Sequence, residues 1–128
     1  MYLVYQNQSH SIHDIFINNK LPYTNNTFSI VHRNHIYKIK NSEITLIFNR
    51  CYLLNNEFYI DLKKYKTSDI SEITKILCNE YSANTTIQFD KELNLDMLKY
   101  IILSKNHPNK HFIEEQKKKY PHLEIMFN

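Results

Sequence analysis

The segment VHRNHIYKIK, residues 31–40, collects side chains that can do chemistry. It holds His32 and His35, one of the two arginines of the chain, and two lysines. Imidazoles at this spacing can ligate a metal or act as acid and base, and with the cations they can contact phosphate groups. Each activity requires the side chains to converge on one point, so the secondary structure that carries them decides which activity is possible.

Metal binding has little support from the spacing. His10 and His13 repeat the three-residue separation of His32 and His35. Two residues three apart share a face on a helix but point to opposite sides of a strand. A structural zinc site requires four converging ligands, and no Cys-x-x-Cys motif accompanies either histidine pair. We therefore predict no metal site and no cofactor.

Acid–base catalysis on RNA is a second possibility. A metal-free ribonuclease needs a base, an acid and a cation around one phosphate. Neighbouring predicted strands supply candidates: His32, Arg33, His35, Tyr37, Lys38 and Arg50. Any sheet rich in histidine and lysine offers such a set, so the pattern is not specific. We lean towards a protein that is not an enzyme and keep a ribonuclease, with His32 or His35 as base, as an alternative.

Cations also alternate with tyrosines, in RNHIYKIK and in DLKKYKTS. Stacking on aromatic rings combined with phosphate neutralisation is how sheets hold single-stranded nucleic acid. The plain structural interpretation is that lysine is the outward residue of amphipathic strands, where it also discourages edge-to-edge pairing. The residues that we assign to a partner-binding or nucleic-acid-binding face are His32, Arg33, His35, Tyr37, Lys38, Lys40, Lys63, Lys64 and Tyr65.

A predicted helix over residues 108–120 carries a further pair, His111 and Glu115. A histidine over a carboxylate at this spacing is an ordinary helix-surface pair worth about 0.2–0.5 kcal/mol, although it can also be an acid–base couple. The His-Glu-x-x-His pattern of metalloproteases is absent. The lysines at 117–119 fit a solvated helix end, where cations complement the helix dipole.

The chain of 128 residues contains no glycine and 16 asparagines. Phosphate-binding P-loops, dinucleotide-binding turns, nucleophile elbows and EF-hand loops all need glycine, so these classes are excluded. Turns with positive φ must fall mostly to asparagine. We expect them at residues 18–19, 25–26 and 55–56.

The residue usage favours amino acids with A/T-rich codons, with 14 lysines against two arginines. The skew fits an A/T-rich microbe, a virus, a phage or a mobile element, and it weakens functional arguments from lysine content. The net charge is only +3. A dedicated nucleic-acid binder usually has a stronger basic excess, so we favour a protein partner over a nucleic acid.

The sequence predicts a cytoplasmic protein, in the host cytoplasm if the source is a virus. The first ten residues lack the basic and apolar regions of a signal peptide, and no apolar run reaches membrane-spanning length. We therefore predict no membrane association. Cys51 and Cys78 lie in apolar surroundings typical of reduced thiols.

Period-two alternation and asparagine-rich breaks predict antiparallel strands in the first half. We expect strands at residues 1–6, 27–31, 35–40, 44–54 and 57–62, with a hairpin turn at residues 55–56. Residues 11–22 fit either a strand or a short helix. In the second half we expect a helix at 68–84 capped by Ser68 or Asp69, a strand at 85–90, helices at 94–106 and 108–120, and a strand at 123–128.

The order of elements predicts one compact α+β domain over residues 1–128: an N-terminal antiparallel β-meander followed by a helix-strand-helix-helix-strand half. A seam near residues 65–68 is the one candidate boundary. The two late strands can pair in parallel through a right-handed crossover. Our leading functional hypothesis is an accessory or inhibitory factor that binds a macromolecular partner. Nucleic-acid binding or a ribonuclease activity on the predicted sheet face is the alternative.

Overall fold

A computed structural model describes residues 1–6, 11–21, 27–39, 44–79 and 85–128. Three sequence predictions fall outside these ranges: the histidine at position 10, the turn at residues 25–26 and the end of the helix expected at residue 84. Lys40 is outside them as well.

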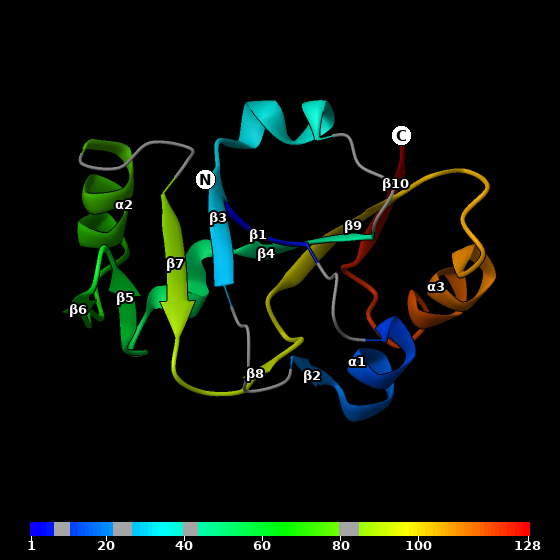
Figure 1. The fold of residues 1–128 in the computed structure, drawn as a ribbon, viewed down its shortest axis with the longest axis horizontal. Helices are drawn as coiled ribbons and strands as arrows, with labels where there is room; N and C mark the ends of the chain where they lie inside the picture. Colours follow the sequence, from blue (N-terminus) through cyan, green and yellow to red (C-terminus); the bar gives the residue numbers. More distant parts are fainter. Residues whose placement is uncertain (7–10, 22–26, 40–43, 80–84) are drawn as a thin grey trace.

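One large sheet runs through the molecule (Figure 1). Its strands are Tyr2–Gln6 (β1), Thr27–Val31 (β3), Thr45–Asn49 (β4), Phe58–Ile60 (β5), Lys63–Tyr65 (β6), Thr86–Phe89 (β7), Leu98–Leu103 (β9) and Glu124–Phe127 (β10). They lie in the order β10-β9-β4-β1-β3-β7-β5-β6. A separate pair is formed by Lys20–Leu21 (β2) and Leu93–Asn94 (β8).

The helices are short. They are Ile12–Asn18 (α1), Ile70–Asn79 (α2) and Lys110–Gln116 (α3), with 3-10 helices at Arg33–Lys38 (η1) and Arg50–Leu53 (η2). Neighbouring strands are antiparallel except β9 and β10, which are parallel and joined through α3. The predicted mixed α+β class, with an antiparallel N-terminal half, is confirmed.

The larger hydrophobic cluster contains alternate residues of the strands together with the buried side chains of all three α-helices. Phe28 on β3 lies at its centre and is fully buried. Its ring centroid is 5.5 Å from Tyr5 on β1, 5.6 Å from Phe48 on β4 and 5.5 Å from Phe89 on β7. The contacts with Phe48 and Phe89 are edge to face, a geometry that adds to the free energy of burial. The ring of Phe28 therefore links four strands.

A smaller cluster covers the opposite face of the central strands. It consists of Val4, Ile47 and Ile102 from three adjacent strands and Ile36 from η1. Ile39 packs against it as well. Side chains three apart eclipse in a 3-10 helix, so η1 presents both isoleucines to the sheet.

The strand predicted at residues 35–40 is therefore wrong. The alternation of apolar and lysine side chains in this segment suggested a strand, but Ile36 and Ile39 are three residues apart, so they share a face only in a helix. Two local features favour the helix: His32 accepts a hydrogen bond from the Asn34 backbone N–H at 3.3 Å, and Ile36 and Ile39 cover the apolar face beneath them.

The helix predicted at residues 94–106 is also wrong, because this segment forms β8 and β9. Leu98, Ile101, Ile102 and Leu103 are all buried, since β9 lies between β4 and β10 and is covered on both faces. A continuous apolar run of this length does not distinguish a doubly buried strand from a helix. The predicted parallel pairing of β7 with β10 is also wrong, because β10 pairs in parallel with β9 and β7 lies between β3 and β5.

The hairpin predicted at residues 55–56 is replaced by one between β5 and β6. Asn55 has a positive φ of 61°, as expected, but its N–H donates to the Thr67 carbonyl at 2.7 Å. The two turn residues of the hairpin are Asp61 and Leu62, with φ values of 50° and 67°. Asn19 has the positive φ expected at residues 18–19, with a value of 56°, and it ends α1.

The helix predicted at 68–84 is present as α2, and Asp69 caps it. The Asp69 carboxylate accepts a hydrogen bond from the Ser71 N–H at 2.8 Å. Its own N–H donates to the Thr67 hydroxyl oxygen at 3.1 Å. These two bonds satisfy donors that the first turn leaves unpaired.

Replacing the central ring tests this packing. Phe28→Ala should lower the free energy of unfolding by about 3–5 kcal/mol, because it removes a fully buried ring and leaves a cavity among three others. Urea unfolding followed by circular dichroism measures the change. Ile17→Ala, at an exposed position on α1, should change it by less than about 0.5 kcal/mol. A Phe28→Ala loss as small as that of the control would contradict this arrangement of the core.

Alkaline pH tests the burial of Tyr52. Burial raises the pKa of Tyr52, whose ring packs 5.3 Å from Phe48 and whose hydroxyl donates to Asn94 at 3.3 Å. A raised folded-state pKa means that stability is fully present below the ordinary tyrosine pKa and is lost as pH rises towards the folded value. The free energy of unfolding measured in urea should therefore decrease above about pH 10, by up to about 1.4 kcal/mol per pH unit for this group. The slope should be smaller in Tyr52→Phe; an identical slope would show that Tyr52 titrates normally.

Candidate functional site

The structure places the first group of predicted site residues on η1 rather than on a strand. His32, Arg33 and His35 are exposed there. Tyr37 and Lys38 belong to the same helix by their backbone, but their side chains, like the whole of residue 40, are outside the described part of the chain. Only the first three can therefore be placed as surface side chains.

The 3-10 geometry brings the two histidines of this helix together. The ring centroids of His32 and His35 are 5.7 Å apart, because residues three apart eclipse one another. Within the described residues, no group of three or more His, Cys, Asp or Glu side chains gathers to hold a metal ion. The pair is thus a solvent-facing feature of η1.

The second group of predicted residues, Lys63, Lys64 and Tyr65, forms the edge strand β6. Strands β7 and β5 lie between β3, which leads into η1, and β6. Figure 1 shows η1 beyond the end of β3 and the hairpin at the far edge of the sheet. The predicted residues therefore form two separate surfaces and not one continuous sheet face.

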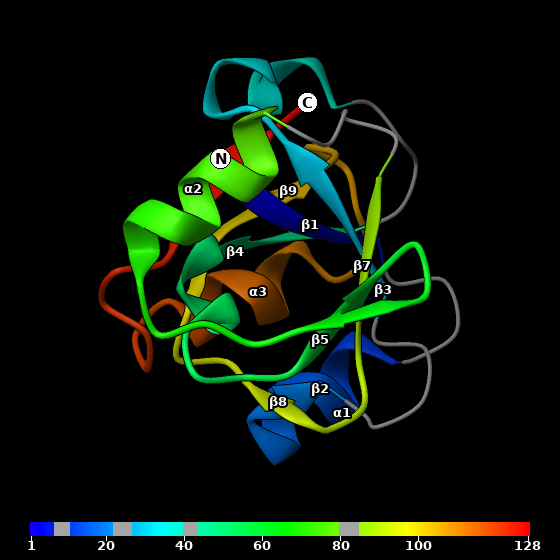
Figure 2. The same ribbon diagram turned by 90° about the vertical axis from the view of Figure 1, so that its left-hand side faces the viewer.

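The first surface, the hairpin tip, consists of Tyr59, Asp61, Leu62, Lys63 and Lys64. Figure 2 looks at this edge of the molecule and shows the hairpin crossing the view, with its turn on the side away from α2. Lys64 forms an ion pair with Glu57 at 2.8 Å and lies 5.9 Å from the centre of the Tyr59 ring. The hydrogen bond from Lys64, followed by its charge, lowers the pKa of Glu57.

The base of the hairpin is held by aromatic packing. Phe58 is buried, and its ring stacks on that of Tyr65 with centroids 5.7 Å apart and planes 19° apart. Tyr59 points to the other face of the strand, where a hydrogen bond with Asp90 raises its pKa. Cross-strand ring pairs of this kind stabilise a two-stranded ribbon and fix its register.

Leu62 stands out on this surface. It is 96% exposed, the highest value among the large hydrophobic residues described, and its φ is 67°. A shallow hollow of about 170 Å³ adjoins it, lined by Tyr59, Asp61, Leu62, Thr86 and Gln88. The sequence predictions missed Leu62, because they placed the turn at the asparagines of residues 55–56. The signal present in the sequence is the short gap between the two strand-forming segments FYI and KKY.

The second surface, the arginine end, consists of Tyr2, Arg33, Arg50, Lys99 and Tyr100. Strand register explains why they meet. Tyr2 is paired with Val31 on one side and with Asn49 on the other. The chain leaves the sheet just after both partners, so η1 and η2, which carry the two arginines, begin at the same end of β1.

Aromatic rings and a cation are in contact at this end. Tyr2 and Tyr100 meet edge to face with centroids 5.7 Å apart. The Lys99 Nζ lies 5.3 Å from the first ring and 5.6 Å from the second. Partial burial raises the pKa of Tyr2, but hydrogen bonds with Lys99 and Tyr100 and the charges of Lys99 and Arg33 outweigh it, so the pKa of Tyr2 is lowered.

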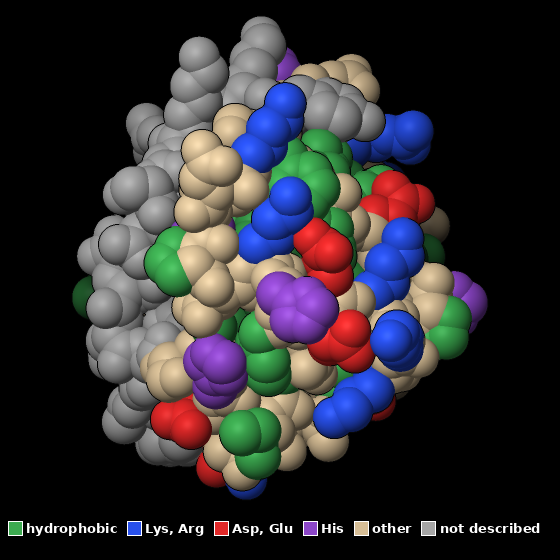
Figure 3. Space-filling model, turned by 90° about the vertical axis from the view of Figure 1, so that its right-hand side faces the viewer, with side chains coloured by type: hydrophobic (Ala, Val, Ile, Leu, Met, Phe, Trp, Pro, Cys, Tyr) green, Lys and Arg blue, Asp and Glu red, His purple; other side chains and the backbone are tan. Residues whose placement is uncertain are grey.

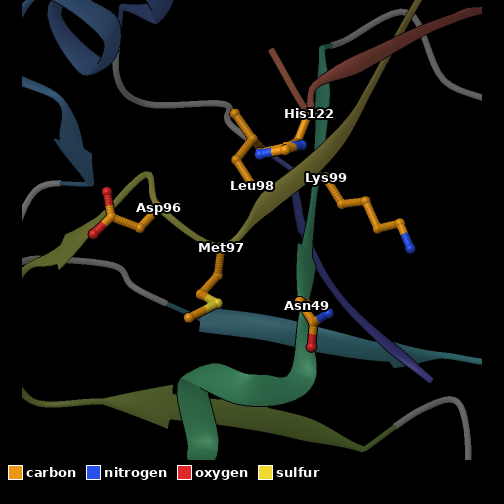
Figure 4. Close-up of a pocket in the computed structure, with 6 residues that line it drawn as sticks. All are labelled: Asn49, Asp96, Met97, Leu98, Lys99 and His122. Atoms are coloured by element: carbon orange, nitrogen blue, oxygen red, sulfur yellow. The ribbon is translucent and has the colours of Figure 1, made fainter. Parts of the chain in front are cut away.

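Two further features belong to the arginine end. The Nε of Arg50 is buried and has no hydrogen-bond partner among the described residues. A pocket of about 210 Å³ lies beside Lys99, lined by Asn49, Asp96, Met97, Leu98, Lys99 and His122. Figure 4 shows the side chains of Asp96 and Lys99 pointing to opposite sides of it, so the carboxylate does not cover the ammonium group.

The face formed by α1 and α3 has a different character. In Figure 3, lysines, carboxylates and histidines are interspersed on it. Glu115 pairs with Lys118 at 3.2 Å and Glu114 with Lys110 at 4.0 Å. The carboxylates near His111 are thus engaged by lysines, which fits the interpretation of this helix as a solvated surface.

His13 has a structural contact that the sequence did not predict. Its ring lies 3.9 Å from that of Phe112, and its Nε2 is 3.1 Å from the Asn109 side-chain oxygen. The histidine therefore packs α1 against α3, which explains its presence without a metal.

Comparison with protein-family models, with curated proteins and with solved structures found no match to this chain. None of the helices in the described ranges is long and apolar enough to span a membrane.

Removing one cation tests the arginine end. Lys99→Gln should raise the pKa of Tyr2, because it deletes both a hydrogen bond to the phenolate and a nearby positive charge. NMR of tyrosine labelled at the ring Cζ follows this titration. Lys105→Gln removes the same charge beyond the opposite end of β9 and should leave the Tyr2 pKa in place. Equal behaviour of the two variants would contradict the contact between Lys99 and Tyr2.

Proposed function

We propose that the chain is an interaction protein that binds a protein partner through the hairpin tip. Leu62 carries the proposal. It is a large apolar side chain, 96% exposed, on a backbone position that leucine disfavours. The exposure of the apolar side chain and the positive φ are both unfavourable in the free protein. Binding to a partner would remove the exposed side chain from water.

The residue type at position 62 is unusual within this chain. The other described residues with positive φ are Asn19, Asn55 and Asp61, which are the residue types that tolerate this conformation best after glycine. With 16 asparagines, the chain has the suitable residue in abundance. A left-handed conformation costs an ordinary L-residue about 1–2 kcal/mol, so folding alone does not favour leucine here. Strain of this kind concentrates at functional sites.

The hairpin is suited to present this side chain rigidly. The stacking of Phe58 on Tyr65 and the ion pair between Glu57 and Lys64 hold both strands. A preorganised contact loses less conformational entropy on binding than a mobile loop. Asp61 and Lys63 flank Leu62, and both are exposed. The partner that fits is therefore a protein with an apolar socket for leucine and with charged groups of both signs at its rim.

The proposal includes the compartment and the role. Cys51 and Cys78 are both free thiols, which supports a reducing compartment such as the cytoplasm. A compact chain that presents one rigid hairpin suits an accessory factor that modulates a larger partner. The composition of the chain is in keeping with a virus, phage or other A/T-rich genome as its source.

Two measurements on Leu62→Asn test the proposal together. The free energy of unfolding should increase by about 0.5–1 kcal/mol, because asparagine tolerates positive φ better than leucine. Partner affinity should decrease by about 10- to 100-fold, because burial of a leucine side chain contributes about 1.5–3 kcal/mol. Chemical denaturation gives the first value, and quantitative capture of partners from source-cell lysate, at low and high salt and with nuclease, gives the second.

Matched variants make the result specific. Leu62→Met keeps an apolar side chain at the same position and should retain both capture and stability. Ile17→Asn removes an exposed apolar side chain from α1 and should also retain capture. A protein captured equally by Leu62→Asn and by the unmodified chain would rule out the hairpin tip. A loss of stability in Leu62→Asn would rule out the strain argument.

A further inference from the structure

The two arginines of the chain stand at the same end of the sheet, although 17 positions separate them in the sequence. The chain contains 14 lysines, so a positive charge alone is readily supplied by lysine. Arginine differs by its planar guanidinium group, whose donors match the oxygens of a phosphate in a bidentate arrangement. The placement of both at one end therefore points to a ligand with such oxygens.

We propose that the arginine end binds a phosphate group, held by Arg33 and Lys99 with the hydroxyl of Tyr2, and that Arg50 adds a positive charge at the same end of the sheet. This site is separate from the hairpin tip. The ligand class is a phosphorylated small molecule or the phosphate of a nucleic-acid backbone, which present the same oxygens to these side chains.

The charges around this end favour an anion. Among the described residues, the four ion pairs join Lys20, Lys64, Lys110 and Lys118 to glutamates, and none of them involves Arg33, Arg50 or Lys99. The Nε–H of Arg50 is buried, and none of the described residues accepts a hydrogen bond from it. A buried donor of this kind is costly unless a ligand or water oxygen completes it.

Two carboxylates lie near this end. Asp96 lines the pocket beside Lys99 but points away from it. Glu124 on β10 is paired in register with Tyr100, so it lies on the same sheet face and opposes an anion there. Arg33 and Lys99 outnumber this single carboxylate, and the lowered pKa of Tyr2 agrees with a positive potential at its hydroxyl.

The rings of Tyr2 and Tyr100 supply the second component of the site. Each is half-buried, and their edge-to-face contact leaves ring surface next to the Lys99 ammonium group. An aromatic surface beside a phosphate-binding cation suits a ligand that joins a planar base to a phosphate. A nucleotide is the simplest such ligand.

An NMR titration of the unmodified chain tests the proposal, with three probes at constant ionic strength: inorganic phosphate, adenosine monophosphate, and a single-stranded oligonucleotide of about eight nucleotides. We expect shifts of the Tyr2, Arg33 and Lys99 resonances that saturate, and a rise of the Tyr2 pKa on binding. Tightest binding of the mononucleotide identifies a small phosphorylated ligand. Tightest binding of the oligonucleotide through the same residues identifies a nucleic-acid backbone.

Variants decide whether these residues form the site. Arg33→Gln and Lys99→Gln should each weaken binding by roughly tenfold, the size of a lost charge-assisted hydrogen bond. Arg33→Lys should recover part of that loss, and Glu124→Gln should strengthen binding. Lys105→Gln removes the same charge outside the site and should keep the binding affinity within about twofold of that of the unmodified chain. Circular dichroism verifies that each variant is folded.

Two results would overturn the proposal. The first is an absence of saturable shifts at Tyr2, Arg33 and Lys99 with all three probes. The second is equal phosphate affinity in Arg33→Gln, Lys99→Gln and Lys105→Gln, because that pattern indicates a general charge effect.

Discussion

A chain without glycine carries a Cβ atom at every left-handed backbone position, and this constraint acts at the four described residues with positive φ. Asparagine or aspartate meets it at three of the four described positions with positive φ. These residues end α1, shape the segment that precedes β5 and begin the β5–β6 turn. Leu62 is the exception, and it is the most exposed of the large hydrophobic residues described. The unfavourable backbone position and the exposed side chain therefore coincide in one residue.

The rest of the fold keeps this turn and the arginine end fixed in place. Rings from four strands meet around Phe28, so β1, β3, β4 and β7 behave as one packed unit. β5 and β6 extend that unit to the hairpin tip, and β9 extends it on the other side to Lys99. Because side chains alternate along a strand, the same strands that bury Leu3 and Tyr5 on one face place Tyr2 on the other. One sheet thus supports two separate surfaces.

Local chemistry in the sequence predicted part of this arrangement. Alternation located β3 and β7, the cap at Asp69 located α2, and asparagine marked the end of α1. Two of the failures share a physical reason, which is burial on a second face of the sheet. β9 is apolar on both faces, so its sequence resembles that of a buried helix, and the isoleucines of η1 cover an apolar sheet face that the local sequence does not reveal. For the candidate sites, composition drew attention to His32 and His35, whereas Leu62 and Lys99 emerge only from turn position and strand register.

The backbone conformation of Leu62 in the free protein is the most direct test of this account, because both its strain and its exposure follow from that turn. NMR measures it through the intraresidue nuclear Overhauser effect between the amide proton and Hα, together with their scalar coupling. The account predicts the strong intraresidue effect of a positive φ near 67°, with cross-strand contacts between Ile60 and Lys63. A negative φ at Leu62, or a turn that starts at another residue, would contradict it.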